Sequence, residues 1–86
     1  MINTYSDPLI ALEVTKKIDR GATVCEIVAE TTDQQTPSEL TITFFGKNAE
    51  EALEGIVKGS RFTYRGIVSF EDRKPKLIGL TFAQID

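Results

Sequence analysis

The chain has 86 residues, which allows a single domain over residues 1–86 with one modest hydrophobic core. Its hydrophobic fraction of 41% is ordinary for a globular protein and excludes a wholly disordered chain. The formal net charge of −3 argues against attraction of nucleic acid by bulk charge, so any such binding requires cations gathered on one face.

No apolar run approaches the roughly 20 residues that span a membrane, and the N-terminal stretch lacks the basic start and apolar core of a signal peptide. The single cysteine, Cys25, excludes an internal disulfide and fits a reducing compartment. Because Cys25 sits inside an apolar run, we expect a small core residue rather than a reactive thiol. These features predict a cytoplasmic protein without a membrane segment.

Catalysis finds little support in the residue types present. The sequence has no histidine, so the usual general base and the commonest metal ligand are both missing. A lone cysteine cannot build a thiolate metal cluster, and no glycine-rich phosphate loop occurs. We therefore expect no catalytic residues, no metal, no cofactor and no small-molecule substrate.

The first half of the chain is rich in strand patterns. Residues 9–15 are predicted to form a strand with Ile10, Leu12 and Val14 on one face, followed by a turn at residues 19–21. The strand predicted over residues 23–31 is apolar on both faces, which is typical of a strand buried on both sides or of the floor of a groove.

A polar loop containing Pro37 leads to a third strand over residues 40–45. Its strict alternation points Ile42 and Phe44 to one side and Phe45 to the other, so Phe45 is a candidate for exposure. The apolar residues that follow are spaced as on one face of a helix, at positions 49, 52, 53, 56 and 57. Asn48 and Glu51 form a capping-box pattern that predicts the helix start, and Lys58 with Gly59 predicts its end.

The fourth strand is predicted over residues 61–70, with Gly66 marking a sharp bend or a bulge. Alternation directs the aromatic side chains of this strand inward, so Phe62, Tyr64 and Phe70 are predicted to be core residues. The last strand is predicted over residues 77–85, and its Phe82 is assigned to the core in the same way. The order of elements predicts an all-β fold with one helix. The predicted architecture is a five-stranded OB-fold barrel with the helix between strands 3 and 4. An SH3-like barrel is the structural alternative.

Two local motifs go beyond the fold class. Residues 45–50 read Phe-Gly-Lys-Asn-Ala-Glu, and residues 58–66 read Lys-Gly-Ser-Arg-Phe-Thr-Tyr-Arg-Gly. Both resemble the bacterial and phage single-stranded-DNA-binding protein family, with ungapped spacing over about residues 40–68. The resemblance implies an OB domain that holds single-stranded DNA across its sheet in replication, recombination or repair, and that commonly assembles as dimers or tetramers. The chain looks like a minimal, diverged relative of the kind that phages and plasmids carry.

The resemblance also assigns individual residues. Phe45 matches the stacking phenylalanine of the family, and Lys47 matches its phosphate-contacting lysine. A base stacked on such a ring contributes about 1–3 kcal/mol and tolerates any sequence, because every base has a π-face. Other candidate DNA contacts are cations at places that flank an OB groove or project from the fourth strand: Lys16, Lys17, Arg20, Arg61, Arg65, Arg73, Lys74 and Lys76.

Several features depart from the family pattern. The chain has no tryptophan, and Glu39 stands about where one of the family's stacking tryptophans would be, so its carboxylate would repel phosphate. The flexible tail with an acidic tip is also missing, so recruitment of partner proteins through it is expected to be lost. An OB-fold module that binds protein through Ile67, Val28 or the helix is therefore the alternative function, and RNA is the alternative nucleic acid. A homodimer or higher homo-oligomer is expected because the core is small.

Overall fold

The computed structural model of the chain describes residues 2–5, 7–32 and 35–85. Six strands and one helix follow one another in this part of the chain. They are β1 (Ile2–Tyr5), β2 (Leu9–Asp19), β3 (Ala22–Thr31), β4 (Glu39–Phe45), α1 (Gly46–Gly55), β5 (Arg61–Glu71) and β6 (Lys74–Ile85).

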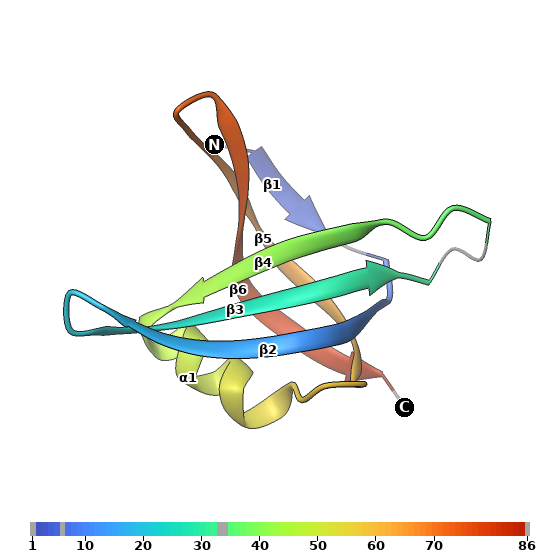
Figure 1. Ribbon diagram of the computed structural model, residues 1–86, viewed down its shortest axis with the longest axis horizontal. Helices are drawn as coiled ribbons and strands as arrows, with labels where there is room; N and C mark the ends of the chain where they lie inside the picture. Colours follow the sequence, from blue (N-terminus) through green and yellow to red (C-terminus); the bar gives the residue numbers. More distant parts are fainter. Residues whose placement is uncertain (1, 6, 33–34, 86) are drawn as a thin grey trace.

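Five of the strands form a closed ring in the order β5-β2-β3-β4-β6, with β6 pairing back onto β5. The β4–β6 pairing is parallel and the others are antiparallel. The helix α1 follows the third strand of the ring and lies across one end of it (Figure 1). The predicted five-stranded OB fold, with its helix between strands 3 and 4, is thereby confirmed, and the SH3-like alternative does not fit.

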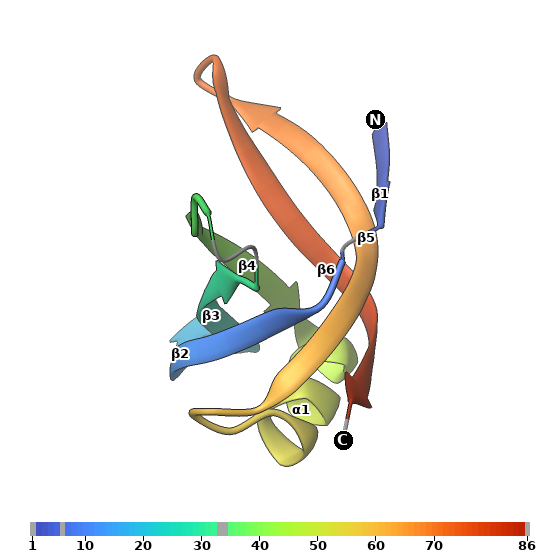
Figure 2. The same ribbon diagram turned by 90° about the vertical axis from the view of Figure 1, so that its right-hand side faces the viewer.

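The short strand β1 was not predicted from the sequence. It pairs antiparallel with β5, from Ile2 opposite Val68 to Tyr5 opposite Arg65. Its four residues are too few to show a periodic pattern, so only the β5 partner reveals it. β1 lies at the outer side of β5, outside the ring (Figure 2).

The core fills the ring and the space beneath α1. Its largest fully buried side chains are Phe44, Phe62, Ile27, Ile42 and Ile56. Each such side chain stabilises the fold by about 1.5–3 kcal/mol relative to exposure. The rings of Phe44 and Phe82 meet edge to face with centroids 6.2 Å apart. The helix contributes Ala49 and Ala52, small residues that let it lie close against the sheet.

The first long strand differs from its prediction because it contains a bulge. The register of β2 against β3 shifts between Ala11 and Glu13, so Leu12 is the extra residue. Leu9 and Ala11 are buried, and after the bulge Val14 packs against the core. The expectation that Ile10, Leu12 and Val14 share one face is therefore wrong. An alternating pattern cannot reveal a one-residue insertion that reverses it.

The helix begins and ends earlier than its capping patterns predict. It starts at Gly46 with Phe45 as N-cap and without a side-chain cap, so Asn48 and Glu51 lie within the helix. It ends at Gly55, where the backbone N–H of Ile56 donates to the carbonyl of Ala52 at 2.8 Å. The predicted end at Lys58 and Gly59 is instead a separate turn that leads into β5.

β5 and β6 form a long hairpin that projects beyond the ring (Figures 1 and 2). The prediction that Phe70 belongs to the core is wrong, because it lies on this projection and is 63% exposed. Tyr64 and Phe62, lower on the same strand, are buried as predicted, and Phe82 packs against the core. Alternation predicts which face of a strand a side chain occupies, but not whether core atoms lie opposite that face.

The predicted irregularity at Gly66 is confirmed as a register shift between Arg65 and Gly66. Gly66 pairs with Gly79 of β6, and a Cβ atom on Gly66 would lie 1.9 Å from the carbonyl oxygen of Ile78. Because that neighbour is backbone, the clash cannot be relieved by rotating a side chain. Glycine is therefore required where the two strands approach.

We expect Gly66→Ala to destabilise the fold by at least about 1–3 kcal/mol, the usual cost of overpacking, because β6 must move to admit the methyl group. The midpoint of urea unfolding, followed by circular dichroism, measures the effect. Ser69→Ala on the same strand is the control and should change the midpoint little. A Gly66→Ala variant as stable as the original chain would contradict the close approach of the two strands at this position.

Candidate nucleic-acid interface

A groove of about 340 Å³ lies on the outer face of the sheet, at the end where β4 runs into α1. Its floor is formed by Val24, Thr43 and Phe45, and Val24 pairs directly with Phe45. Its walls come from the β2–β3 hairpin and from β6: Lys17, Ile18, Asp19, Glu26 and Lys76. The groove therefore combines an aromatic ring, two cations and two carboxylates.

Phe45 is the aromatic group of this groove. Its neighbour Phe44 is fully buried, whereas Phe45 is 37% exposed, so the predicted alternation at the end of β4 is confirmed. The ammonium of Lys76 lies 5.2 Å from the centroid of the Phe45 ring, a cation–π contact between β6 and β4. A planar apolar surface and a positive charge thus occupy one place, which is what stacking of a base and pairing of its phosphate require.

Lys17 lies at the opposite wall and forms an ion pair with Glu26 of β3. Their side chains are 57% and 31% exposed, so water screens the pair, and it contributes at most about 1 kcal/mol. A phosphate that enters the groove therefore meets a lysine whose existing partner is easily exchanged.

Cys25 lies behind the groove floor and is fully buried, which confirms it as a core residue. Burial, and to a lesser extent the neighbouring Glu26 carboxylate, raise the pKa of the Cys25 thiol to about 11. The thiol is therefore protonated near neutral pH and is a poor nucleophile.

The structure brings together only some of the cations proposed from the sequence. Lys17 and Lys76 line the groove with Phe45. Lys16 is on the other face of β2, since successive side chains alternate. The remaining cations are exposed but do not line the groove: Arg20 at the β2–β3 turn, Lys47 in the first turn of α1, Arg61 and Arg65 on β5, Arg73 at the tip of the β5–β6 hairpin and Lys74 at the start of β6.

The exposure of two apolar side chains, Ile18 and Phe70, was not predicted from the sequence. Ile18 is 63% exposed and lines the groove, and its place as an apolar residue within a charged hairpin was a usable signal. Phe70 is equally exposed, but its pairing with Pro75 sets it on the other side of the hairpin from Lys76, which pairs with Ser69. The groove thus gains an aliphatic wall, whereas Phe70 stands apart from it.

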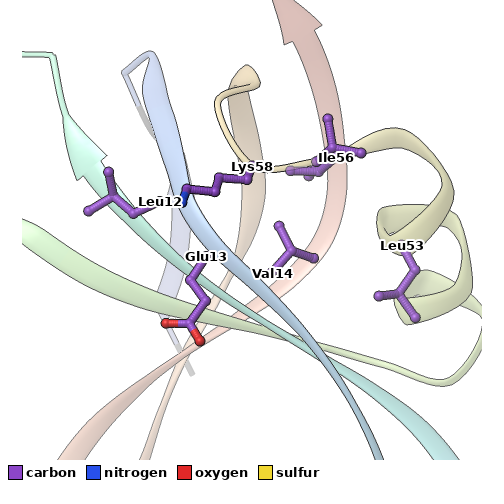
Figure 3. Close-up of a pocket in the computed structure, with 7 residues that line it drawn as sticks. Leu12, Glu13, Val14, Leu53, Ile56 and Lys58 are labelled. Atoms are coloured by element: carbon purple, nitrogen blue, oxygen red, sulfur yellow. The ribbon is translucent and has the colours of Figure 1, made fainter.

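A second groove, of about 560 Å³, lies between β2 and the C-terminal end of α1 (Figure 3). Its walls are largely aliphatic, from Leu12, Val14, Leu53 and Ile56, with Glu13 and Lys58 beside them. Because this lining holds no aromatic ring, it offers no platform for a base. Over residues 2–5, 7–32 and 35–85 there is no cluster of three metal-ligating side chains and no helix long and apolar enough to cross a membrane.

Solved structures with a similar fold include single-stranded-DNA-binding proteins and PriB proteins. The SSB domain of a Synechococcus sp. protein has a TM-score of 0.77 at 13% identity, with 95% of this chain and 93% of that chain covered. The second single-stranded-DNA-binding protein (SSBb) of Mycobacterium smegmatis has a TM-score of 0.80 at 8% identity, covering 96% and 87%. This chain has the fold of single-stranded-DNA-binding domains.

The N-terminal domain of PriB from Thermoanaerobacter tencongensis, described as dimeric, has a TM-score of 0.75 at 13% identity and covers 99% of this chain and 97% of that one. At the level of sequence, no family model and no curated protein matches the chain. The likeness is therefore one of fold, and what the groove binds has to be argued from its own residues.

We expect Cys25 to react slowly with iodoacetamide in the folded protein. With a pKa of about 11, only about one thiol in a thousand is ionised at pH 8, and burial restricts access further. Alkylation at pH 8 should be more than about 100-fold faster in urea, where the thiol regains an ordinary pKa of about 8.5. Mass spectrometry measures both rates, and equal rates would show that Cys25 is accessible in the folded state.

Proposed function

We propose that this protein binds single-stranded DNA with little sequence preference, using the groove at the end of β4. The observation that carries the proposal is the half-exposed Phe45 ring with the Lys76 ammonium 5.2 Å from its centroid. This pair lies on an OB-fold sheet, where such folds hold oligonucleotides. The structures of similar fold, which include single-stranded-DNA-binding proteins, support the same substrate class.

Binding exchanges weak internal contacts for stronger ones. The contact between Lys76 and the exposed ring of Phe45 contributes about 0.5–1 kcal/mol, whereas a hydrogen bond from an ammonium to a phosphate contributes about 1.5–3 kcal/mol. The ammonium therefore leaves the ring for the phosphate, and a base stacks on the ring that it exposes. Lys17 exchanges its screened Glu26 partner for phosphate in the same way.

The net charge of −3 limits how many phosphates are bound. Three cations stand at or next to the groove, namely Lys17 and Lys76 in its walls and Lys47 on the helix that begins directly after Phe45. Neutralising three to five phosphates of a single strand gives a slope of log affinity against log salt of about −2 to −3.5. We propose modest affinity that depends on salt.

We further propose a homodimeric, cytoplasmic protein that protects single strands during replication, recombination or repair, and that is not an enzyme. The dimeric PriB domain from Thermoanaerobacter tencongensis supports self-association, and among the strands that the structure describes β1 has a neighbour on one side only. An unpaired edge of this kind is a common place for two chains to join.

A protein-interaction module is the second candidate function. The aliphatic groove between β2 and α1 favours it, because apolar concave surfaces are typical of contacts with other molecules. A module of that kind would show no salt-dependent affinity for single-stranded DNA, so the same titration separates the two functions.

Fluorescence-anisotropy titration of labelled oligo-dT, with duplex DNA and RNA as comparisons, tests the proposed function. Phe45→Ala should weaken binding by about 5- to 150-fold, the equivalent of one lost base stack. Val57→Ala is the matched control, since Val57 is 61% exposed but lies in the aliphatic groove. No binding by the unaltered chain at low salt would exclude DNA as its ligand and leave the protein-interaction module.

Lys76→Gln should weaken binding equally for all single-stranded sequences and make the salt slope shallower by about 0.7, because one phosphate contact is lost. Titrations of oligo-dT at three salt concentrations give the slope. Lys58→Gln removes the same charge from the aliphatic groove and should leave the slope unchanged. Identical slopes for the Lys76 variant and the unaltered chain would remove Lys76 from the interface.

A further inference from the structure

The sheet face that carries Phe45 changes in character along its strands. Figure 1 shows β2, β3 and β4 side by side on this face. At one end Lys17, Val24 and Phe45 stand in register across the three strands. Towards the other end the outward residues of β3 and β4 finish in Glu30 and Glu39. The face therefore runs from an end where an aromatic ring lies among two lysines and two carboxylates to an end where two paired carboxylates stand together.

Glu30 and Glu39 are direct cross-strand partners. Their neighbours Ala29 and Leu40 pack into or against the core, so alternation turns both glutamates outward. Within the part of the chain that the structure describes, neither carboxylate forms an ion pair. Two like charges with Cβ atoms about 4.5–5.5 Å apart repel each other, and together they present a concentrated negative charge to anything lying on the sheet.

The distance between the two ends decides what these carboxylates can affect. Phe45 and Glu39 are six residue steps apart along β4, which is about 20 Å at about 3.3 Å per residue. That is about two Debye lengths in 0.1 M salt, so the glutamates scarcely weaken a phosphate held at Phe45. A phosphate lying over the acidic end is instead a few ångströms from both carboxylates, where screening is weak.

We infer that Glu30 and Glu39 form an acidic barrier that ends the nucleic-acid path and confines a bound strand to the Phe45 end of the face. The inference rests on the proposed single-strand binding and defines its extent. A strand long enough to cover the whole face gains nothing from its additional phosphates, because they meet the barrier. The protein therefore holds a short segment rather than a strand laid along the sheet.

Oligonucleotide length separates this inference from a general effect of charge. The double variant Glu30→Gln, Glu39→Gln and the unaltered chain are titrated with oligo-dT of about 5 and about 16 nucleotides, which bracket the site sizes of OB folds. For the long oligonucleotide the double variant should bind about 3- to 15-fold tighter, with a salt slope steeper by about 0.7 to 1.4. For the short one, affinity should stay within about 2-fold.

A matched variant, Glu51→Gln, Glu54→Gln, makes the same change in charge on the exposed side of α1. An equal gain for both oligonucleotides, shared by this control, would mean that only net charge matters and would overturn the barrier. Unchanged binding of both oligonucleotides by the Glu30, Glu39 variant would also overturn it. The urea midpoint of that variant should not fall, since a repulsion is removed.

Failure of the proposed function looks different from failure of the barrier. If the unaltered chain binds neither oligonucleotide at low salt, single-strand binding itself is wrong, and the barrier fails with it. If the unaltered chain binds the short oligonucleotide but neutralising Glu30 and Glu39 has no length-dependent effect, binding stands and the barrier alone is rejected.

Discussion

The close approach of β5 and β6 at Gly66 and Gly79 is the constraint on which the rest of the molecule depends. A Cβ on Gly66 would strike the backbone of Ile78, and a Cβ on Gly79 would lie 2.3 Å from the ring of Phe44. Gly79 also pairs in parallel with Phe44, so the position that closes the ring also leaves room for a fully buried phenylalanine ring of the core. The ring closes only because both positions lack side chains.

The groove follows from this closure. With the Phe44 ring held inside against Gly79, alternation turns Phe45 out, and the chain enters α1 at the next residue. The parallel contact also sets β6 beside β4, which brings Lys76 from the base of the projecting hairpin to the Phe45 ring. Core residues and groove residues are thus adjacent in sequence, because successive side chains of a strand point to opposite faces of the sheet.

This coupling explains which features were predictable from the sequence. The order of elements along the chain, the exposure of Phe45 and the irregular pairing at Gly66 all follow from local patterns that the fold obeys. The bulge at Leu12, the strand β1, the exposure of Phe70 and the contact of Lys76 with Phe45 depend on partners distant in sequence. The helix bounds were wrong for a related reason, since the chain leaves β4 directly into α1 and the Asn48 cap is not used.

The acidic net charge and the proposed function are compatible because charge acts locally in salt. Over a Debye length of about 10 Å, a phosphate at Phe45 responds to Lys17 and Lys76 far more than to carboxylates at the other end of the sheet. Net charge therefore bears on how many phosphates can bind, whereas the placement of two lysines decides whether any bind. On this face Glu30 and Glu39 limit the length of single strand that is bound, because they stand where a longer strand would have to lie.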